Sequence, residues 1–196
     1  MSKVILDNNL KKKIPNILSF GRILLVPMFV FLLIEPNEAT TFWALVIFVI
    51  ASLTDWLDGY LARVFEAQSI LGKLLDPLAD KILTMAALVM LAAYPLEPRI
   101  PAWMVVFLLA REFLVSGLRS VAAVKGIVVS ASRLAKYKTA VMMISIVFLL
   151  VRETHTFFGY SVDFFSVGMI TLWLAFLLSI SSGISYGISL KKVFLE

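Results

Sequence analysis

Apolar residues fall into six long runs that are separated by short polar stretches. The runs cover residues 17–34, 41–60, 74–93, 101–123, 134–151 and 163–189. About 20 apolar residues in a helix cross the hydrocarbon core of a bilayer. The runs are apolar on nearly every side, whereas the strands of a membrane barrel would be shorter and would alternate. The pattern therefore predicts six transmembrane helices, without strands, in one all-α membrane domain over residues 1–196.

The connections between the runs are short and contain turn-forming residues. The stretches EPNEATT (35–41), AYPLEPR (93–99) and RETHTFFGYS (152–161) are expected to be turns or loops. No polar domain, low-complexity linker or clear internal repeat interrupts the sequence. A second domain is therefore not expected.

The first 13 residues, MSKVILDNNLKKK, carry four lysines and precede the first apolar run. Val4, Ile5, Leu6, Leu10 and Ile14 would form the apolar side of a short interfacial helix. A cleaved signal peptide also begins with basic residues before an apolar stretch. The first run is too long for that and lacks a small-residue cleavage site after it, so the segment is expected to stay on the protein.

Composition narrows the class of protein further. Hydrophobic residues make up 61% of the 196 residues and charged residues 16%, whereas soluble domains are about half apolar and about a quarter charged. This excludes a soluble enzyme and a disordered chain. The absence of cysteine excludes a disulfide scaffold, thiolate metal sites and cysteine nucleophiles.

The positions of the basic residues predict the orientation in the membrane. Three of the turns, at 35–40, 94–100 and 152–162, contain only Arg99 and Arg152 of the 18 lysines and arginines. Basic residues concentrate on the cytoplasmic side of membrane proteins. Six spans with both termini in the cytoplasm satisfy this rule, and the basic excess indicates attraction to anionic lipid rather than to nucleic acid.

Four aspartates lie close together where the second run ends and the third begins. They are Asp55, Asp58, Asp76 and Asp80. Their spacings of three and four residues place each pair on one face of its helix. Because the two spans are expected to be antiparallel neighbours, all four carboxylates would point to one space near the cytoplasmic edge.

Four carboxylates at the edge of a membrane repel one another and are costly to insert unless cations neutralise them. Two divalent cations would do so, and oxygen ligands without histidine or cysteine favour Mg²⁺ or Mn²⁺. Gly59 and Ala62 leave room on the same helix face, and Arg63 is suited to phosphate. The pattern thus predicts a site for a diphosphate. Alternatively, Asp76 before Pro77 could be a helix N-cap, and the first two aspartates could be solvated helix-end charges.

The same stretch is similar to the signature of the CDP-alcohol phosphotransferase family, D-x2-D-G-x2-A-R-x8-G-x3-D-x3-D, at every fixed position. The matching residues are Asp55, Asp58, Gly59, Ala62, Arg63, Gly72, Asp76 and Asp80. The resemblance implies six transmembrane helices, usually in a homodimer. It also implies a reaction in which a hydroxyl group displaces CMP from a CDP-linked lipid or alcohol.

The resemblance also implies a role for each site residue. Asp55 and Asp76 would bridge two metal ions, Asp58 and Asp80 would each complete one coordination sphere, and Asp80 would be the general base. The nucleotide end would lie against Asn16, Ser19, Arg22, Gly59, Ala62, Arg63 and Gly72. Metal-assisted direct attack needs no covalent intermediate, and the only histidine, His155, is expected in an outer loop without a catalytic role.

Basic residues of the fourth and fifth runs are candidates for binding the acceptor. They are Arg111, Arg119, Arg133, Lys136 and Lys138. Arg111 stands beside Glu112 within an apolar run, which topology alone does not explain. So many donors would suit an acceptor that carries its own phosphate.

Over nearly its whole length the chain resembles one bacterial branch of the family. The segments that carry this resemblance are 14–27, 75–81, 111–119 and 130–139. In that branch CDP-diacylglycerol reacts with sn-glycerol 3-phosphate in the cell membrane, with the site facing the cytoplasm. One departure is Ala135, where a glycine commonly precedes the lysine. The resemblance implies these two substrates for the present chain.

Other functions remain open from the residues alone. The acceptor could be serine, inositol phosphate or phosphatidylglycerol. A prenyltransferase also uses aspartates and Mg²⁺ on a diphosphate, but has two separate motifs and more spans. Intramembrane carboxylates also occur in ion-coupled transporters, although these four lie at one membrane edge.

The small residues Ser179, Gly183 and Gly187 would pack helices or form a dimer interface.

Overall fold

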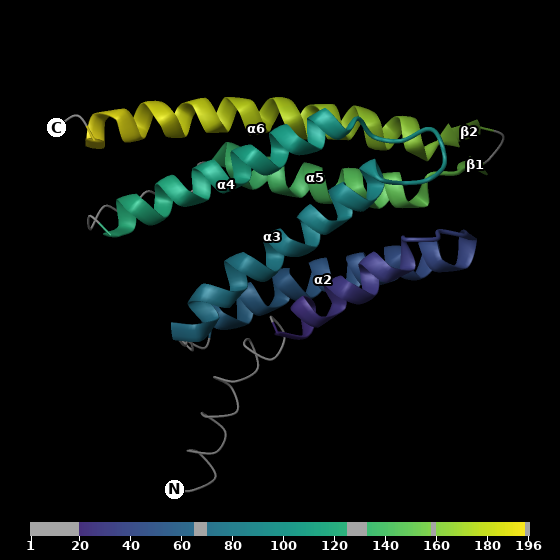
Figure 1. Ribbon diagram of the computed structural model, residues 1–196, viewed down its shortest axis with the longest axis horizontal. Coiled ribbons are helices and arrows are strands. Elements are labelled where there is room, and N and C mark those ends of the chain that lie inside the picture. The colour runs from purple at the N-terminus through teal and green to yellow at the C-terminus, as the bar shows by residue number, and fades with distance from the viewer. Residues whose placement is uncertain (1–19, 65–69, 125–132, 158–159, 195–196) are drawn as a thin grey trace, which may run out of the picture. The chain divides into compact units, whose positions relative to one another are not determined.

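In the computed structural model, residues 20–64, 70–124, 133–157 and 160–194 are described, without the side chains of 55–80, 124, 133, 157 and 189–194. Each of the six apolar runs contains a helix. The helices are Phe20–Leu32, α2 (Glu38–Val64), α3 (Ile70–Ala92), α4 (Ala102–Val124), α5 (Arg133–Val151) and α6 (Phe164–Phe194), as Figure 1 shows. The predicted all-helical architecture is therefore confirmed for these segments. The interfacial segment predicted at 1–13 lies outside the described residues.

Several helices continue beyond the apolar runs that predicted them. The helix α3 begins at Ile70 rather than near residue 74, and α6 reaches Phe194. Backbone hydrogen bonding continues a helix whether or not its side chains are apolar, so these ends include the polar residues Lys73, Lys191 and Lys192 together with apolar ones. One alternative is thereby excluded, because Asp76 lies inside α3 and is not its N-cap.

Two helices are long and apolar enough to cross a membrane, at Leu134–Val151 and Phe164–Ile188. The other apolar stretches found among the described residues, at Phe20–Leu32, Glu38–Thr54 and Lys81–Ala92, are shorter. The structure thus supports a mostly helical chain with two candidate membrane-spanning helices.

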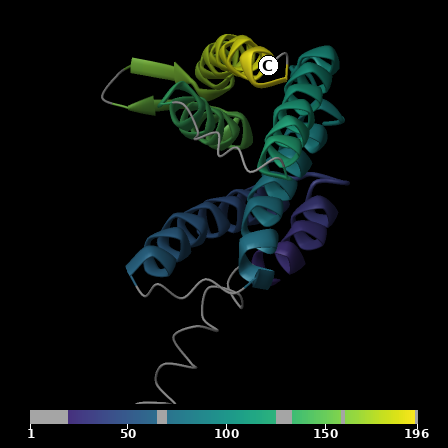
Figure 2. The ribbon, with the colours of Figure 1, turned by 90° about the vertical axis from the view of Figure 1, so that its left-hand side faces the viewer.

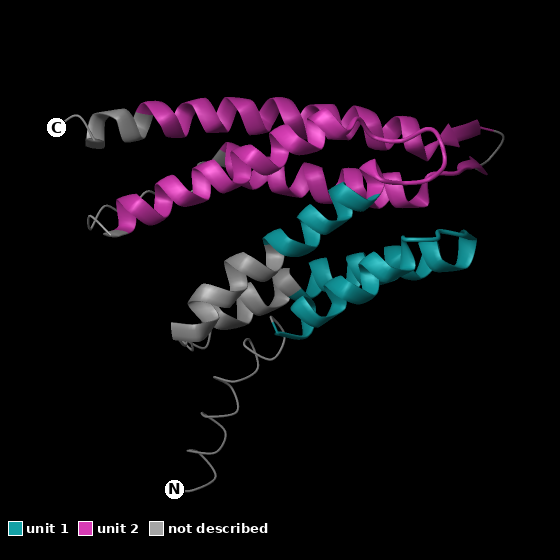
Figure 3. Ribbon diagram, in the orientation of Figure 1, with its two compact units in different colours: residues 1–90 teal, residues 91–196 magenta. Residues whose placement is uncertain are grey.

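The chain divides into two compact units, residues 1–90 and 91–196, which Figure 3 distinguishes by colour. In the first unit, the Phe29 and Phe48 rings lie 6.2 Å apart between the first described helix and α2. Leu33, which directly follows the first described helix, and Ala44 on α2 are also buried. Buried apolar side chains therefore hold the first described helix against α2, the helix that contains Asp55 and Asp58.

The second unit is built around α6. The helices α5 and α6 lie side by side in both Figure 1 and Figure 2, and α4 also contacts α6. Buried side chains on α5 and α6 include Ile146, Leu149 and Leu172. The Ser145 hydroxyl donates to the Gly168 carbonyl at 2.8 Å, so these helices approach closely at this glycine.

Large apolar side chains also cover the outside of the helices. Phe31, Phe113 and Ile170 each expose more than 60% of their surface. An extensive exposed apolar surface is unfavourable in water and indicates a lipid or protein neighbour. It agrees with the membrane location expected from the composition.

The turn between α5 and α6 differs from the prediction. It contains an antiparallel hairpin of β1 (Thr154–Phe157) and β2 (Tyr160–Asp163), in which Thr154 pairs with Asp163 and Phe157 with Tyr160. The expectation of no strands was therefore wrong here. Threonine, valine, tyrosine and phenylalanine favour extended backbone, and the hairpin is too short to produce a clear alternating pattern.

Arg152 stabilises this end of the second unit. Its backbone has a φ of 61° directly after α5, and its Nη2 donates to the Leu96 carbonyl at 2.7 Å and to that of Pro98. The guanidinium also lies 4.2 Å from the centroid of the Tyr94 ring. Partial burial lowers the pKa of Arg152 from its usual value. The residue thus connects the turn before α4 to the turn after α5.

Substituting Gly168 with alanine tests the close approach of α5 and α6. A Cβ at this position would meet the Leu149 Cγ at 2.7 Å and the Leu149 backbone nitrogen at 3.0 Å. We expect Gly168→Ala to lower the free energy of unfolding by about 1–3 kcal/mol, as overpacked sites do. Thermal unfolding in detergent measures this. Gly187→Ala is the control, because its Cβ would meet nothing within 4 Å, and equal melting temperatures for both variants would refute the close contact.

Asp163 caps α6, and its removal should have a pH-dependent effect. Its carboxylate accepts hydrogen bonds from the Ser166 hydroxyl and, at 3.0 Å, from the Phe165 N–H. The Ser166 hydroxyl bond, with smaller backbone contributions, lowers the pKa of Asp163. A lowered folded-state pKa contributes stability above the unfolded-state pKa of about 3.9 and loses it as the pH falls through the folded value.

Asp163→Ala should therefore lower the melting temperature at pH 7, and the difference from the wild type should narrow below about pH 4. Asp163→Asn should retain most of the stability at pH 7, because asparagine is also a good N-cap. A difference between wild type and Asp163→Ala that does not change with pH would contradict this role.

Candidate active site

The aspartates lie at matching distances from the connection between α2 and α3. Asp58 is six residues before the end of α2 at Val64, and Asp76 is six residues after the start of α3 at Ile70. Asp55 and Asp80 are nine and ten residues from the same connection. With a rise of about 1.5 Å per residue, the inner pair lies about 9 Å and the outer pair about 14–15 Å along the helices. This backbone register agrees with the predicted common depth.

The side chains of the predicted metal and nucleotide residues lie outside the described part of the chain, with one exception. Asn16 and Ser19 precede the first described residue, and the side chains of the rest belong to 55–80: Asp55, Asp58, Gly59, Ala62, Arg63, Gly72, Asp76 and Asp80. The exception is Arg22, which is 2% exposed on the first described helix. It is thus buried within its unit rather than directed to lipid.

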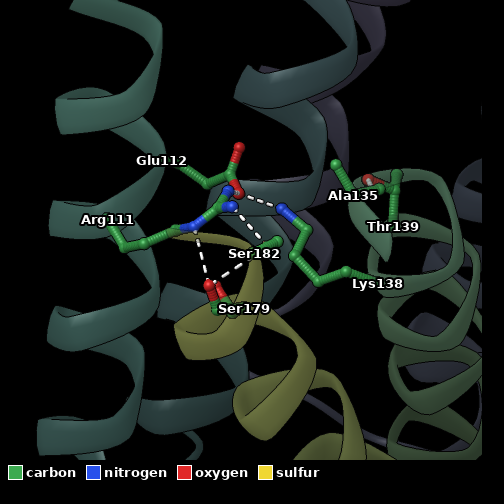
Figure 4. Close-up of polar contacts among 7 residues, drawn as sticks. All are labelled: Arg111, Glu112, Ala135, Lys138, Thr139, Ser179 and Ser182. Atoms are coloured by element: carbon green, nitrogen blue, oxygen red, sulfur yellow. Dashed lines mark hydrogen bonds and ion pairs between the residues drawn. The ribbon is translucent and has the colours of Figure 1, made fainter. Parts of the chain in front are cut away.

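A cluster of charged side chains lies among α4, α5 and α6, as Figure 4 shows. The Glu112 Oε1 accepts from the Arg111 Nη1 at 2.8 Å and also from the Lys138 Nζ. Arg111 and Glu112 belong to α4, and Lys138 belongs to α5. The structure therefore brings together two of the five cations that were predicted to bind an acceptor, through a carboxylate between them.

The helix α6 supplies the other contacts of Arg111. The Arg111 Nε donates to the Ser179 carbonyl at 3.0 Å, and the Nη2 donates to the Ser182 hydroxyl at 2.6 Å. A Cβ on Gly183 would lie 3.4 Å from the Arg111 Nε. Of the two alternatives for the small residues of α6, Ser179 and Gly183 follow helix packing, because both lie against Arg111 of α4. At Gly187 a Cβ would meet nothing within 4 Å.

The cluster is well shielded from solvent. The side chains of Lys138, Arg111 and Glu112 are 4%, 15% and 16% exposed. Isolated charges are unfavourable in such an environment, and each of these is paired and hydrogen-bonded. Two cations around one carboxylate leave a formal charge of +1. This arrangement can attract an anion such as a phosphate.

Arg119 and Lys136 have no described contact with this cluster. The Arg119 guanidinium lies 6.0 Å from the centroid of the Tyr186 ring, and Lys136 is exposed on α5. The side chain of Arg133 lies outside the described residues. His155 is on β1, and its ring lies 5.4 Å from that of Phe164. It is not one of the residues in contact with Arg111, Glu112 or Lys138 in the described part of the chain.

Glu112 and the serines of α6 were not identified as site residues from the sequence. The available signal for Glu112 was its position beside Arg111 inside an apolar run, where an unpaired carboxylate would be costly. Ser182 gave no comparable signal, because serine is common where membrane helices pack. Its contact with Arg111 joins residues that are 71 positions apart.

A model of the family described as CDP-alcohol phosphatidyltransferase matches residues 12–181. The chain belongs to this family. Membership of the CDP-alcohol phosphatidyltransferase family confirms the resemblance found at the aspartates and makes the chain a transferase. The matched residues include all four aspartates, Arg111, Glu112 and Lys138, and end two residues after Ser179.

Relatives within the CDP-alcohol phosphatidyltransferase family share one name, CDP-diacylglycerol–glycerol-3-phosphate 3-phosphatidyltransferase. The protein of Bacillus subtilis is 36% identical over 185 residues, which cover 88% of this chain and 92% of the relative. That of Rickettsia felis is 38% identical over 183 residues, 93% of this chain and 98% of the relative. That of Haemophilus influenzae is 35% identical over 181 residues, which cover 90% of this chain and 92% of the relative. The similarity thus extends over nearly the whole of each protein.

Proposed function

We propose that this chain transfers the phosphatidyl group of CDP-diacylglycerol to sn-glycerol 3-phosphate, which gives phosphatidylglycerophosphate and CMP. The observation that carries the proposal is the shared name of relatives that are 35–38% identical over most of the chain. The cluster of Arg111, Glu112 and Lys138 supports an acceptor that carries a phosphate, because it has a formal excess of one positive charge. Family membership favours this reaction over a prenyltransferase or an ion-coupled transporter.

The proposed location is the bacterial cell membrane, with six spans, both termini in the cytoplasm and the site facing the cytoplasm. Support comes from the six helical runs, the exposed apolar side chains and the scarcity of basic residues in three of the turns. A homodimer is proposed from the family resemblance. These assignments are consistent with substrates of which one is a membrane lipid and the other is soluble.

Two divalent cations, Mg²⁺ or Mn²⁺, are proposed at Asp55, Asp58, Asp76 and Asp80. The donor set fits such ions, because it consists of carboxylates at matching distances from one connection and hard oxygen donors suit these cations. When bound, the ions would stabilise the negative charge that develops on the attacking and leaving oxygens.

The protein groups would orient the substrates and move one proton. Asp80 is proposed to accept the proton of the acceptor hydroxyl. The hydroxyl oxygen then forms a bond to the phosphorus that carries the diacylglycerol. The bond from that phosphorus to the bridging oxygen breaks, and CMP leaves with the bond electrons. Asn16, Ser19, Arg22, Gly59, Ala62, Arg63 and Gly72 are proposed to hold the cytidine diphosphate portion.

The acceptor phosphate is proposed to bind basic residues of α4 and α5. These are Arg111, Arg119, Arg133, Lys136 and Lys138. Charge-assisted hydrogen bonds from arginine and lysine to phosphate are about twice as strong as neutral ones. They would therefore select glycerol 3-phosphate over an uncharged alcohol of similar size.

A CMP-release assay on the purified protein in detergent tests the reaction and the acceptor. We expect CMP release to require both CDP-diacylglycerol and glycerol 3-phosphate. A chelator should abolish it, and Mg²⁺ or Mn²⁺ should restore it. Release with serine, inositol phosphate or phosphatidylglycerol in place of glycerol 3-phosphate would overturn the proposed acceptor. No metal-dependent release with any acceptor would overturn the reaction.

The substitution Asp80→Asn tests the proposed base. A general base contributes about 10²–10⁴-fold to a rate, so we expect kcat to fall at least about 100-fold while the melting temperature stays close to that of the wild type. Asp163→Asn is the matched control, because it removes an exposed carboxylate on β2. Activity of Asp80→Asn within about twofold of the wild type would exclude Asp80 as the base.

A further inference from the structure

A single carboxylate oxygen joins the two buried cations of the second unit. The Glu112 Oε1 accepts from the Arg111 Nη1 and from the Lys138 Nζ, and so connects α4 with α5. The charged groups converge on it in Figure 4. Because one atom accepts both bonds, the position of Glu112 determines the distance between the two cations.

The guanidinium of Arg111 is also held in one orientation by α6. Its Nε and Nη2 donate to the Ser179 carbonyl and the Ser182 hydroxyl, at 3.0 and 2.6 Å. A guanidinium has five N–H groups. The two contacts with α6 and the one with Glu112 use three of them. Within the described contacts, one N–H on each terminal nitrogen is therefore left for a ligand.

A second observation beside Arg111 indicates unused hydrogen-bonding capacity. Ser179 is 2% exposed, and its Oγ has no hydrogen-bond partner among the described residues. Buried hydroxyl groups are nearly always hydrogen-bonded in folded proteins. A polar ligand or a water beside the guanidinium would supply the missing partner.

Without Glu112, the two cations would repel each other. Both belong to side chains that are at least 85% shielded from solvent, where like charges are poorly screened. Arg111 would keep its contacts with α6, whereas Lys138 would lose the carboxylate that holds it next to Arg111. The two sets of donors would then no longer converge.

We propose that Glu112 is a positioning residue that holds Arg111 and Lys138 together, so that the two cations form one site for the phosphate of the acceptor. This inference rests on the proposed function, since it assigns the acceptor phosphate to these two cations. The serines of α6 maintain the orientation of Arg111. Glu112 does not itself contact the phosphate, because both groups are negatively charged.

A simple counter-charge would behave differently from a positioning residue. If Glu112 only reduced the positive charge, its neutralisation would increase the attraction for phosphate and lower the KM for glycerol 3-phosphate. If Glu112 positions the cations, the same change would raise this KM. A misplacement of about 1 Å can cost up to about 100-fold in such sites, so the two effects have opposite signs.

The test compares steady-state kinetics of the full-length wild type, Glu112→Gln and Glu112→Asp in detergent. We expect Glu112→Gln to raise the KM for glycerol 3-phosphate about tenfold and to leave the KM for CDP-diacylglycerol within about twofold. Glu112→Asp keeps the charge and should give an intermediate KM for glycerol 3-phosphate. A KM for glycerol 3-phosphate that falls or stays unchanged in Glu112→Gln, or an equal rise of both KM values, would overturn the proposal.

Glu153→Gln is the control, because Glu153 is exposed beyond the end of α5 and is expected to leave both KM values unchanged. Ser182→Ala is a second variant without a change of charge, for use if Glu112→Gln does not fold. It removes one Arg111 hydrogen bond and should raise the KM for glycerol 3-phosphate about two- to fivefold, and an unchanged value would overturn the proposal. Failure of the proposed function is recognised separately, as the absence of glycerol 3-phosphate-dependent CMP release by the wild type.

Discussion

Charge inside an apolar helical bundle is stable only when opposite charge and hydrogen-bond partners accompany it. In the second unit this requirement is met by Arg111, Glu112 and Lys138, with the serines of α6 as further partners. Lys138 joins α5 to Glu112 of α4, and the two serines join α6 to Arg111 of α4. The cluster therefore connects α4 to both of the other helices. Removing one member of a buried ion pair commonly costs about 3–5 kcal/mol. Because desolvation makes an intact buried pair often no more stable than apolar residues of similar volume, its presence here suits a role in binding a substrate.

Elsewhere the chain meets the same requirement in other ways. At the turn between α5 and α6, Arg152 uses backbone carbonyls and the face of the Tyr94 ring in place of a carboxylate. At the aspartates of α2 and α3, four negative charges would need cations from solution, and divalent metal ions are the proposed partners. Each group of charged residues can thus be assigned to structure, to metal binding or to phosphate binding by the partners that are available to it.

Much of the fold could be predicted from the sequence, because each apolar run forms a helix through local hydrogen bonds. The ends were less predictable: α3 and α6 continue past the apolar runs through Lys73 and through Lys191 and Lys192, and Asp76 lies inside α3 although it precedes a proline. The hairpin after α5 was missed because four-residue strands carry too few alternating positions to be distinguished from a loop.

The candidate site was predicted in its residue types but not in its contacts. The aspartates and the cations were identified from spacing, from the family resemblance and from the cost of charge in a membrane. The bridge through Glu112 and the orientation of Arg111 by Ser179 and Ser182 depend on residues 26 to 71 positions apart. Only the packing of three helices brings them together, and no local pattern encodes that packing.

A structure of the protein with bound glycerol 3-phosphate would show directly whether the cluster holds the acceptor. We expect the phosphate to lie within hydrogen-bonding distance of Arg111 and Lys138, while Glu112 still bridges the two cations. A phosphate bound elsewhere, with the cluster of Arg111, Glu112 and Lys138 unchanged and without ligand, would show that these charges only hold the helices together.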